Sequence, residues 1–224
     1  MNIIITGATG MVGKAVLLEA IEDNRIKKIT LINRRTVGVN YPKIHEIIHA
    51  DLSDLTNIEN ELAGYDACFF CMGVSVLGLN EEKYAKITYG ITAHFADILY
   101  KLNPQMVFNY VSGTGTDSSE KGSSMWARVK GRTENYILKK GFKDAYMFRP
   151  GAILPKKGIK SSTGWYNFLY VLLRPIFPLI EKSKNITTTT KLGKAMISTL
   201  QRPMELKHLE NLDINTLADA YHGN

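Results

Sequence analysis

Hydrophobic and polar positions follow two different periods along this chain, and the pattern predicts strands that alternate with helices. Residues 3–5 form a continuously apolar, β-branched run, as expected of a strand that is covered on both faces of a sheet. A turn with glycines at positions 7, 10 and 13 follows, and residues 14–22 then carry apolar side chains at helical spacing. The chain therefore opens with a strand, a glycine turn and a helix.

The same alternation continues through the rest of the chain. Further strands are predicted at 27–33, 45–50, 65–72, 105–111, 145–149 and 206–209. Helices are predicted at 54–63, 81–102, 121–139, 187–200 and 213–221. This order predicts a Rossmann-like, doubly wound α/β fold with a mostly parallel sheet of about six or seven strands. We expect a single domain over residues 1–224, in which 153–224 contributes a small C-terminal substrate cap.

The glycine turn is the first candidate site, with the spacing Gly7-x-x-Gly10-x-x-Gly13. A strand, a turn and a helix N-terminus bring backbone N–H groups to one point, which suits a diphosphate. We expect Gly7 to make the tight turn, Gly10 to allow close approach of a phosphate, and Gly13 to pack the helix on the strand. The alternative is a turn that binds nothing.

The stretch from Thr6 to Gly13 resembles the opening of extended and atypical short-chain dehydrogenases/reductases, including the NAD-dependent epimerases and dehydratases. The resemblance extends to about residue 153 and rests also on Asp51, Gly73, Ser112, Lys130 and the triplet Arg149-Pro150-Gly151. It implies a dinucleotide cofactor. The cofactor-binding residues that it implies are Gly7, Thr9, Gly10, Met11, Val12, Asn33, Arg34, Arg35, Asp51, Leu52, Cys71, Met72, Gly73, Lys130, Pro150 and Gly151.

The end of the second strand indicates which dinucleotide to expect. Dinucleotide folds often place Asp or Glu here to hold the ribose hydroxyls, whereas this chain has Asn33 followed by Arg34 and Arg35. A guanidinium is planar, multidentate and always charged, which matches a 2′-phosphate. We therefore expect NADP(H) rather than NAD(H). The alternative is that both arginines are solvated loop charges.

Asp51 allows two interpretations. The resemblance implies that Asp51 and Leu52 lie beside the adenine, where the Asp51 carboxylate accepts from the adenine amino group. Alternatively, Asp51 or Ser53 caps the next helix. Both roles are compatible with each other.

The catalytic candidates are Ser112, Thr114 and Lys130. The resemblance implies a Ser or Thr at the end of the fifth strand that hydrogen-bonds the substrate carbonyl, and both Ser112 and Thr114 qualify. It also implies a tyrosine four residues before the lysine on one helix face. The lysine holds the nicotinamide ribose and lowers the tyrosine pKa, and the tyrosine exchanges the proton. Here Trp126 stands in place of that tyrosine, and an indole N–H is not a useful acid or base.

Two functions are therefore expected. The first is an oxidoreductase that transfers a hydride to or from a small carbonyl or alcohol, with solvent or another tyrosine as the proton source. The second is a non-catalytic NADP(H)-binding regulator or protein-interaction partner. The loss of the tyrosine at Trp126 favours this second function.

Composition changes this picture little. Hydrophobic residues make up 45% of the chain and charged residues 22%, which is ordinary for a folded globule. The formal net charge is +7, but there is no run of five like charges and no recognisable RNA- or DNA-binding module, so nucleic-acid binding is not expected. The first strand begins directly after Met1, which leaves no room for a signal peptide, so a cytoplasmic location is expected.

Two other residue pairs have the spacing of a redox or metal site but lack further features that such a site needs. Cys68 and Cys71 have C-x-x-C spacing, but in a strand-like apolar run we expect packing or cofactor-lining thiols rather than a redox pair. His45 and His49 share a strand face without a third ligand nearby, so no metal site is expected.

Residues 165–180 form a very apolar and aromatic segment. The segment is shorter than the about 20 residues needed to span a bilayer, and Arg174, Pro175 and Pro178 interrupt it. We expect a helix that packs over the substrate cleft. The alternative is a peripheral membrane anchor or a partner-binding face. The protein is expected to be a monomer or a homodimer, and the resemblance implies dimers built on 81–102 and 121–139.

Overall fold

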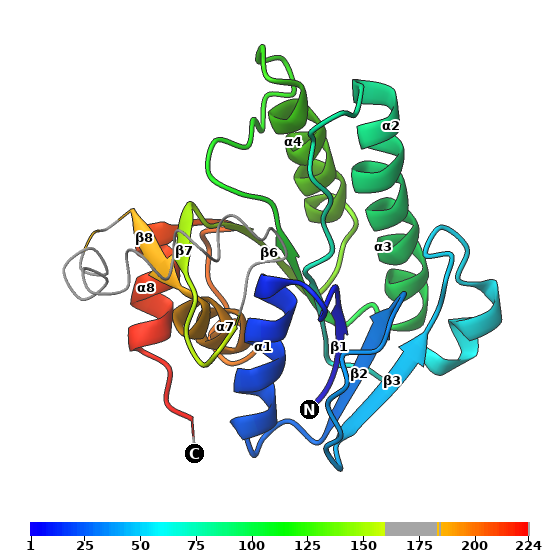
Figure 1. Cartoon of the computed structure of the whole chain (residues 1–224), viewed down its shortest axis with the longest axis vertical. Helices are drawn as coiled ribbons and strands as arrows, with labels where there is room; N and C mark the ends of the chain where they lie inside the picture. The colour runs from blue at the N-terminus through cyan, green and yellow to red at the C-terminus, as the bar shows by residue number, and fades with distance from the viewer. Residues whose placement is uncertain (160–182, 184, 224) are drawn as a thin grey trace.

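The computed structural model describes residues 1–159, 183 and 185–223, so the predicted segment 165–180 lies outside the described residues. Within these residues, seven parallel strands form one sheet in the order β3-β2-β1-β4-β5-β6-β9 (Figure 1). The strands are β1 (Asn2–Thr6), β2 (Lys28–Asn33), β3 (Ile44–Ile48), β4 (Ala67–Phe70), β5 (Val107–Val111), β6 (Asp144–Arg149) and β9 (His208–Glu210). The predicted Rossmann-like α/β fold is confirmed.

Helices cover both faces of this sheet (Figure 1). One face carries α1 (Met11–Glu22), α7 (Thr189–Ser198) and α8 (Asn211–Asp219); the other carries α2 (Glu81–Ala85), α3 (Ile91–Leu102) and α4 (Met125–Leu138). Strand β1 explains the two cores between these layers. Ile3 and Ile5 pack with the α1 side, whereas Ile4 packs with the α3 and α4 side. All three are buried, because side chains alternate across a strand that is covered on both faces.

The strand order of the sheet reverses at β1. Strands β2 and β3 lie on one side of β1, whereas β4, β5, β6 and β9 follow on the other. Ligands of open α/β sheets bind outside the carboxyl ends of the strands at such a switch point. The glycine turn lies there, because it directly follows the carboxyl end of β1.

Two of the predicted helices differ in type from the expectation. The predicted helix 54–63 is a short 3₁₀ helix, Thr56–Glu61, whose segment closes with i→i+3 bonds, as brief helical connectors often do. The predicted helix 81–102 is divided by a π-helical segment, Lys86–Gly90, which separates α2 from α3. Gly90, a weak helix former, ends this widened segment.

The C-terminal part contains two strands that the hydrophobic pattern does not predict. Strand β8 (Ile186–Thr188) pairs in parallel with β7 (Ala152–Leu154), so the predicted helix 187–200 begins only at Thr189. Thr188 marks this start because its hydroxyl accepts from the Lys191 N–H at 3.1 Å. Helix α7 packs against α1 and α8. Among the described residues, no helix is both long and apolar enough to cross a membrane.

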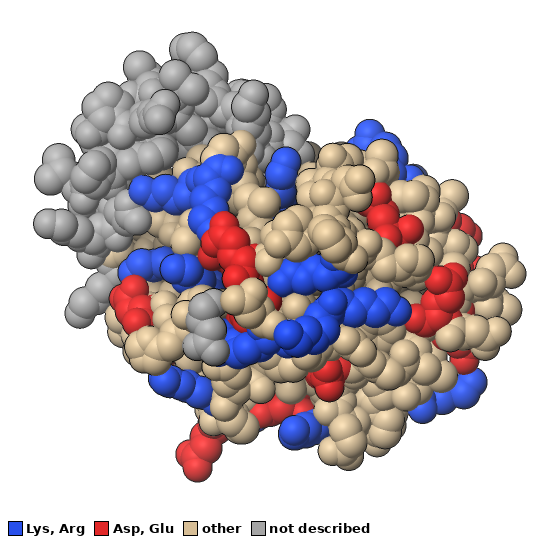
Figure 2. Space-filling view, turned by 90° about the horizontal axis from the view of Figure 1, so that it is seen from below, with Lys and Arg blue, Asp and Glu red and all other residues tan. Residues whose placement is uncertain are grey.

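Charged side chains of both signs share the surface. The face seen from below in Figure 1 carries lysines and arginines interspersed with acidic side chains (Figure 2). Some basic side chains are paired, as Lys157 is with Glu19 and Glu22 at 2.8 and 2.7 Å. Lys191 likewise pairs with Asp219 at 2.8 Å. Neighbouring carboxylates therefore neutralise some of the basic side chains locally.

Candidate functional site

The glycine turn is held by close backbone contacts. Gly7 has φ +69°, and a Cβ there would lie 2.8 Å from the Cys71 carbonyl oxygen at the end of β4. A Cβ on Gly13 would lie 2.3 Å from the Gly7 carbonyl oxygen, so α1 packs directly on the turn. The Gly10 N–H donates to the same Gly7 oxygen at 2.9 Å. These contacts agree with the roles expected of Gly7 and Gly13.

Helix α1 presents an uncapped N-terminus to this turn. It begins at Met11 directly after Gly10, without a side-chain cap and without an acidic residue in its first turn. The first N–H groups of a helix have no partner within the helix, and they carry a partial positive charge. The turn therefore offers hydrogen-bond donors to an anion.

A cavity of about 260 Å³ opens at the carboxyl ends of β1, β2 and β4, and we call it the glycine pocket. Its lining residues are Gly7, Thr9, Gly10, Ile32, Asn33, Arg34, Arg35, Leu52, Cys71, Met72 and Gly73. The structure thus brings together ten of the residues that the sequence singled out, from four separate segments. The lining contains two arginines and no carboxylate among the residues that the structure describes.

Six of the implied cofactor residues lie outside that lining. Met11 and Val12 open α1 just behind the turn, while Lys130, Pro150 and Gly151 lie near the ends of β5 and β6.

The sixth, Asp51, forms a local turn with Ser53, and the predicted helix cap is not formed, because the 3₁₀ helix begins after Leu55 without a side-chain cap. Its carboxylate accepts from the Ser53 N–H at 2.9 Å and from the Ser53 hydroxyl at 2.6 Å, and these bonds lower the Asp51 pKa. The exposed Asp51 thus stabilises the turn that leads to the 3₁₀ helix.

Asn33 links the glycine turn to the arginine loop. Its amide oxygen accepts from the Ala8 N–H at 3.0 Å, and its amide nitrogen donates to Glu46 on β3 at 3.4 Å. The Glu46 carboxylate also accepts from the Thr36 hydroxyl at 2.6 Å and from the Val37 N–H at 2.9 Å. Glu46, which the sequence did not single out, therefore anchors the loop that carries Arg34 and Arg35.

Lys130 and Trp126 occupy one face of α4, as their spacing predicts. The Lys130 ammonium donates to the backbone carbonyl of Ser112, directly after β5. Burial lowers the Lys130 pKa to about 8, and the Glu134 charge opposes this effect. The Trp126 ring lies against the loop after β5, because a Cβ on Gly115 would lie 3.6 Å from the indole.

The two candidate hydroxyls differ in their surroundings. The Ser112 hydroxyl is buried and donates to the Glu134 carboxylate at 2.5 Å. Thr114 is more exposed, and its hydroxyl donates to the Arg149 carbonyl oxygen at 3.0 Å and lies 3.3 Å from Glu210. Thr114 is thus the more accessible of the two hydroxyls.

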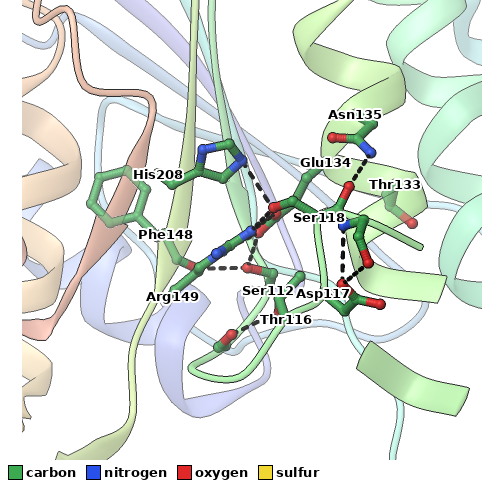
Figure 3. A network of polar contacts seen from close by, with 12 residues as sticks. Ser112, Thr116, Asp117, Ser118, Thr133, Glu134, Asn135, Phe148, Arg149 and His208 are labelled. Atoms are coloured by element: carbon green, nitrogen blue, oxygen red, sulfur yellow. Dashed lines mark hydrogen bonds and ion pairs between the residues drawn. The ribbon is translucent and has the colours of Figure 1, made fainter. Parts of the chain in front are cut away.

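A mostly buried cluster of polar side chains, with the ion pair of Glu134 and Arg149 at its centre, lies beside Ser112 (Figure 3). We call Ser112, Glu134, Arg149 and His208 the charge network. Glu134 accepts from Arg149 Nε at 3.0 Å and from a second nitrogen of the same guanidinium, and His208 Nε2 lies 3.5 Å away. The Glu134 side chain is 0% exposed and that of Arg149 is 12% exposed. The sequence singled out Ser112 and Arg149 but not Glu134 or His208.

The cysteines and histidines show no arrangement of a redox or metal centre within the described part of the chain. Burial raises the pKa of both Cys68 and Cys71, so neither is a reactive thiolate at neutral pH. His45 lies 3.2 Å from Glu61, and His49 lies 2.6 Å from the Asp54 carbonyl oxygen. No group of three or more potential metal ligands occurs among the described residues.

A parallel sheet in this strand order, with a glycine turn at its switch point, defines an NAD(P)-binding Rossmann fold. The chain belongs to the NAD dependent epimerase/dehydratase family, whose model matches residues 3–137.

Curated relatives support the same assignment. The chain is 30% identical over 171 residues to the mitochondrial protein FMP52 of Candida albicans, covering 75% of this chain and 72% of that protein. It is 28% identical over 156 residues to protein HTATIP2 of Rattus norvegicus, covering 68% of this chain. That match spans 63% of the rat protein, which is less than two thirds of its length.

Solved structures share the fold at low sequence identity. The Bordetella bronchiseptica enzyme WbmH, in complex with NAD+, superposes with a TM-score of 0.66 at 15% identity, over 98% of this chain and 79% of that one. The Helicobacter pylori ADP-L-glycero-D-manno-heptose-6-epimerase gives a TM-score of 0.69 at 14% identity, over 98% and 82%.

Proposed function

We propose that this protein binds NADP(H) in the glycine pocket and acts as an oxidoreductase on a small carbonyl or alcohol. The observation that carries the proposal is the lining of the pocket. An uncapped helix N-terminus and two arginines converge there, and no carboxylate is present among the described lining residues. Such a lining favours a polyanion with an additional phosphate over a ribose with free hydroxyls.

The residues of the pocket fit a dinucleotide. The glycines remove side chains where the turn, β4 and α1 approach one another, so the N–H groups of the turn can come close to a diphosphate. Arg34 and Arg35 supply charge for a 2′-phosphate, and Glu46 fixes the loop behind them. Cys71, Met72 and Gly73 line the pocket at the end of β4, next to β5, and Ser112 and Thr114 follow the end of β5.

The catalytic roles are assigned to the region that follows β5. A bound nicotinamide would supply or accept the hydride. Lys130, on α4, holds the nicotinamide ribose, as the family resemblance implies. Thr114 hydrogen-bonds the substrate oxygen, because its hydroxyl is more accessible than that of Ser112. Trp126 shapes the substrate side, since its indole N–H donates a hydrogen bond but exchanges no proton.

Calorimetric titration tests the cofactor preference. NADPH is expected to bind the wild type more tightly than NADH. In the double variant Arg34→Ala/Arg35→Ala, NADPH affinity should fall about tenfold to a hundredfold, the usual worth of charge-assisted hydrogen bonds. NADH affinity should hardly change. Equal affinity of the wild type for both dinucleotides would contradict the proposal.

The activity is tested separately with NADPH and a panel of ketones, quinones and sugar nucleotides. Turnover that Lys130→Met reduces supports an enzyme. Absence of turnover in the presence of demonstrated NADPH binding would instead support a non-catalytic NADP(H)-binding regulator or interaction partner. Trp126 is the observation that favours this second function. Replacement by tyrosine separates the two, because a gain of reductase activity in Trp126→Tyr would reveal a site that lacks only its acid.

The cellular location is also proposed rather than fixed by the fold. We retain the cytoplasm, as expected from the sequence, although the names of the FMP52 relatives place those proteins in mitochondria. Fractionation of cells that express the tagged full chain decides this point. Enrichment with the mitochondrial markers would contradict the cytoplasmic location.

A further inference from the structure

Glu134 is a buried carboxylate to which the proposed function gives no role. It lies on α4, four residues after Lys130, and its side chain is 0% exposed. Taking a carboxylate out of water costs several kcal/mol unless donors surround it. Three donors do so here, because the Ser112 hydroxyl and two nitrogens of Arg149 all point at its oxygens (Figure 3).

Ser112 connects Glu134 to Lys130. The Ser112 hydroxyl donates to Glu134 at 2.5 Å, while its backbone carbonyl accepts from the Lys130 ammonium. One residue is therefore held from both sides by two side chains of the same helix. Glu134 and Lys130 therefore contact the same residue through its side chain and its backbone.

The charge of Glu134 also acts on Lys130. Burial lowers the Lys130 pKa to about 8, and Glu134 is the charge that raises it again. This attraction favours the protonated ammonium, the form that carries the N–H donors for Ser112 and for a ligand.

The other titratable groups around Glu134 do not replace its charge. The imidazole of His208 faces Glu134, Arg149 and Glu210, and burial lowers its pKa, so His208 is neutral at pH 7. Arg149 also approaches Glu210 at 3.6 Å, but Glu210 is half exposed. Glu134 is thus the buried anion that balances Arg149.

The same network reaches the loops after β5 and β6. The Thr114 hydroxyl donates to the Arg149 carbonyl oxygen at 3.0 Å, and the Thr114 N–H donates to the Pro150 carbonyl oxygen at 3.1 Å. The Ser112 N–H donates to Phe148 in the same way at 2.9 Å. The two loops that carry the substrate-side candidates are therefore bonded to each other, and Ser112 and Arg149, which contact the Glu134 carboxylate, belong to the paired segments.

We propose that Glu134 is a positioning residue, which through Ser112 and Arg149 fixes the Lys130 ammonium and the loops after β5 and β6. The proposal rests on the proposed function only in giving Lys130 its role toward the ligand. The dependence of the Lys130 position and pKa on the buried Glu134 carboxylate is a property of the cofactor-free protein.

The test measures the Lys130 pKa in the cofactor-free protein. Lysines are reductively methylated with ¹³C-formaldehyde and titrated by NMR, and the Lys130 resonance is assigned from its absence in Lys130→Arg. In Glu134→Gln, which keeps the shape but removes the charge, the Lys130 pKa should fall by about half a pH unit or more. The matched control is Glu120→Gln, because Glu120 is exposed and its carboxylate accepts from the Asn135 amide at 2.7 Å. This control should leave the Lys130 pKa unchanged.

A second variant covers the case in which Glu134→Gln does not fold. Glu134→Gln/Arg149→Met removes both buried charges, and such replacements are often tolerated. The Lys130 pKa should fall in this variant also, because Glu134 is the charge that raises it. The proposal would be overturned if either variant folds and its Lys130 pKa equals that of the wild type.

This result is independent of whether the protein is a reductase. If the wild type fails to bind NADPH, the proposed function fails while the Lys130 titration still decides the role of Glu134. If the wild type turns over a carbonyl, the pH profile of kcat in Glu134→Gln should move in the same direction as the Lys130 pKa. An unmoved profile would count against a positioning role.

Discussion

Two neighbouring regions of the sheet edge are built by different physical means. The glycine pocket, at the ends of β1, β2 and β4, is shaped by backbone that packs too closely for a Cβ at Gly7 or Gly13. The region at the ends of β5, β6 and β9 is shaped instead by buried charges around Glu134. The first arrangement leaves room and N–H donors for a ligand, whereas the second fills its own interior. The closely packed backbone of the glycine pocket is suited to binding a ligand, whereas the charge network is suited to positioning side chains.

The charge network should be the more fragile of the two regions. Arg149→Ala leaves the buried Glu134 without its cation, and breaking such a pair costs about 3–5 kcal/mol. Arg128→Ala is the control, because Arg128 pairs with the half-exposed Glu81 at 2.7 Å and should cost about 0–1 kcal/mol. Urea denaturation measures both. Similar losses in the two variants would show that the network is not held by buried charge.

We expect the glycine pocket to be disrupted by a steric clash when a side chain is added at Gly13. In Gly13→Ala the new Cβ would lie 2.3 Å from the Gly7 oxygen, so the turn must move. We expect a loss of about 1–3 kcal/mol in the free energy of unfolding and a loss of NADPH binding. Gly90→Ala is the control, because the nearest atom to its new Cβ is 3.9 Å away and alanine favours the helix. Unchanged NADPH affinity in Gly13→Ala would separate the turn from the cofactor.

Glu46 tests how far the pocket depends on one side chain. Glu46→Ala removes the acceptor of the Thr36 and Val37 donors, and each such bond is worth about 0.5–1.5 kcal/mol. The preference for NADPH over NADH should therefore fall by about twofold to tenfold, measured by calorimetry. Glu61→Ala, at an exposed residue that lies beside His45 on β3, should leave the preference as it is. An equal change in both variants would argue against a specific anchor.

Lys130 gives an effect of a different kind, a pH dependence of the free energy of unfolding. Because burial lowers the Lys130 pKa from 10.5 to about 8, the unfolded chain binds more protons between these two values. The contribution of Lys130 to stability therefore rises with pH in this window and is least favourable below about pH 8. Lys130→Met should be more stable than the wild type at pH 7, and this gap should narrow by pH 10. Urea denaturation measures this difference in the free energy of unfolding. An equal difference at pH 7 and pH 10 would contradict a lowered pKa of the buried Lys130 ammonium.

The two regions also differ in what their sequence reveals. The glycine pocket was predictable because strand, turn and helix are adjacent in the chain, and the glycines carry the pattern. Arg34 and Arg35 could be placed there because they end the next strand. The charge network could not be predicted in the same way, because its members come together only through the fold. Glu134 bonds to Ser112, 22 residues before it, and to Arg149, 15 residues after it.

Local pattern also fails where tertiary context decides the form of an element. A glutamate at position 134 of an amphipathic helix has no feature that marks it as buried. Strands β7 and β8 are three residues each, too short for a periodicity to identify them. The π-helical segment before α3 likewise follows from packing rather than from the apolar spacing of 81–102.

Co-crystallisation with NADPH is the most direct test of the glycine pocket. We expect the diphosphate at the turn between Gly7 and Gly10, facing the N-terminus of α1, and the 2′-phosphate beside Arg34 and Arg35. A pocket that remains empty, or that is filled by the protein's own side chains while NADPH is in excess, would contradict cofactor binding there.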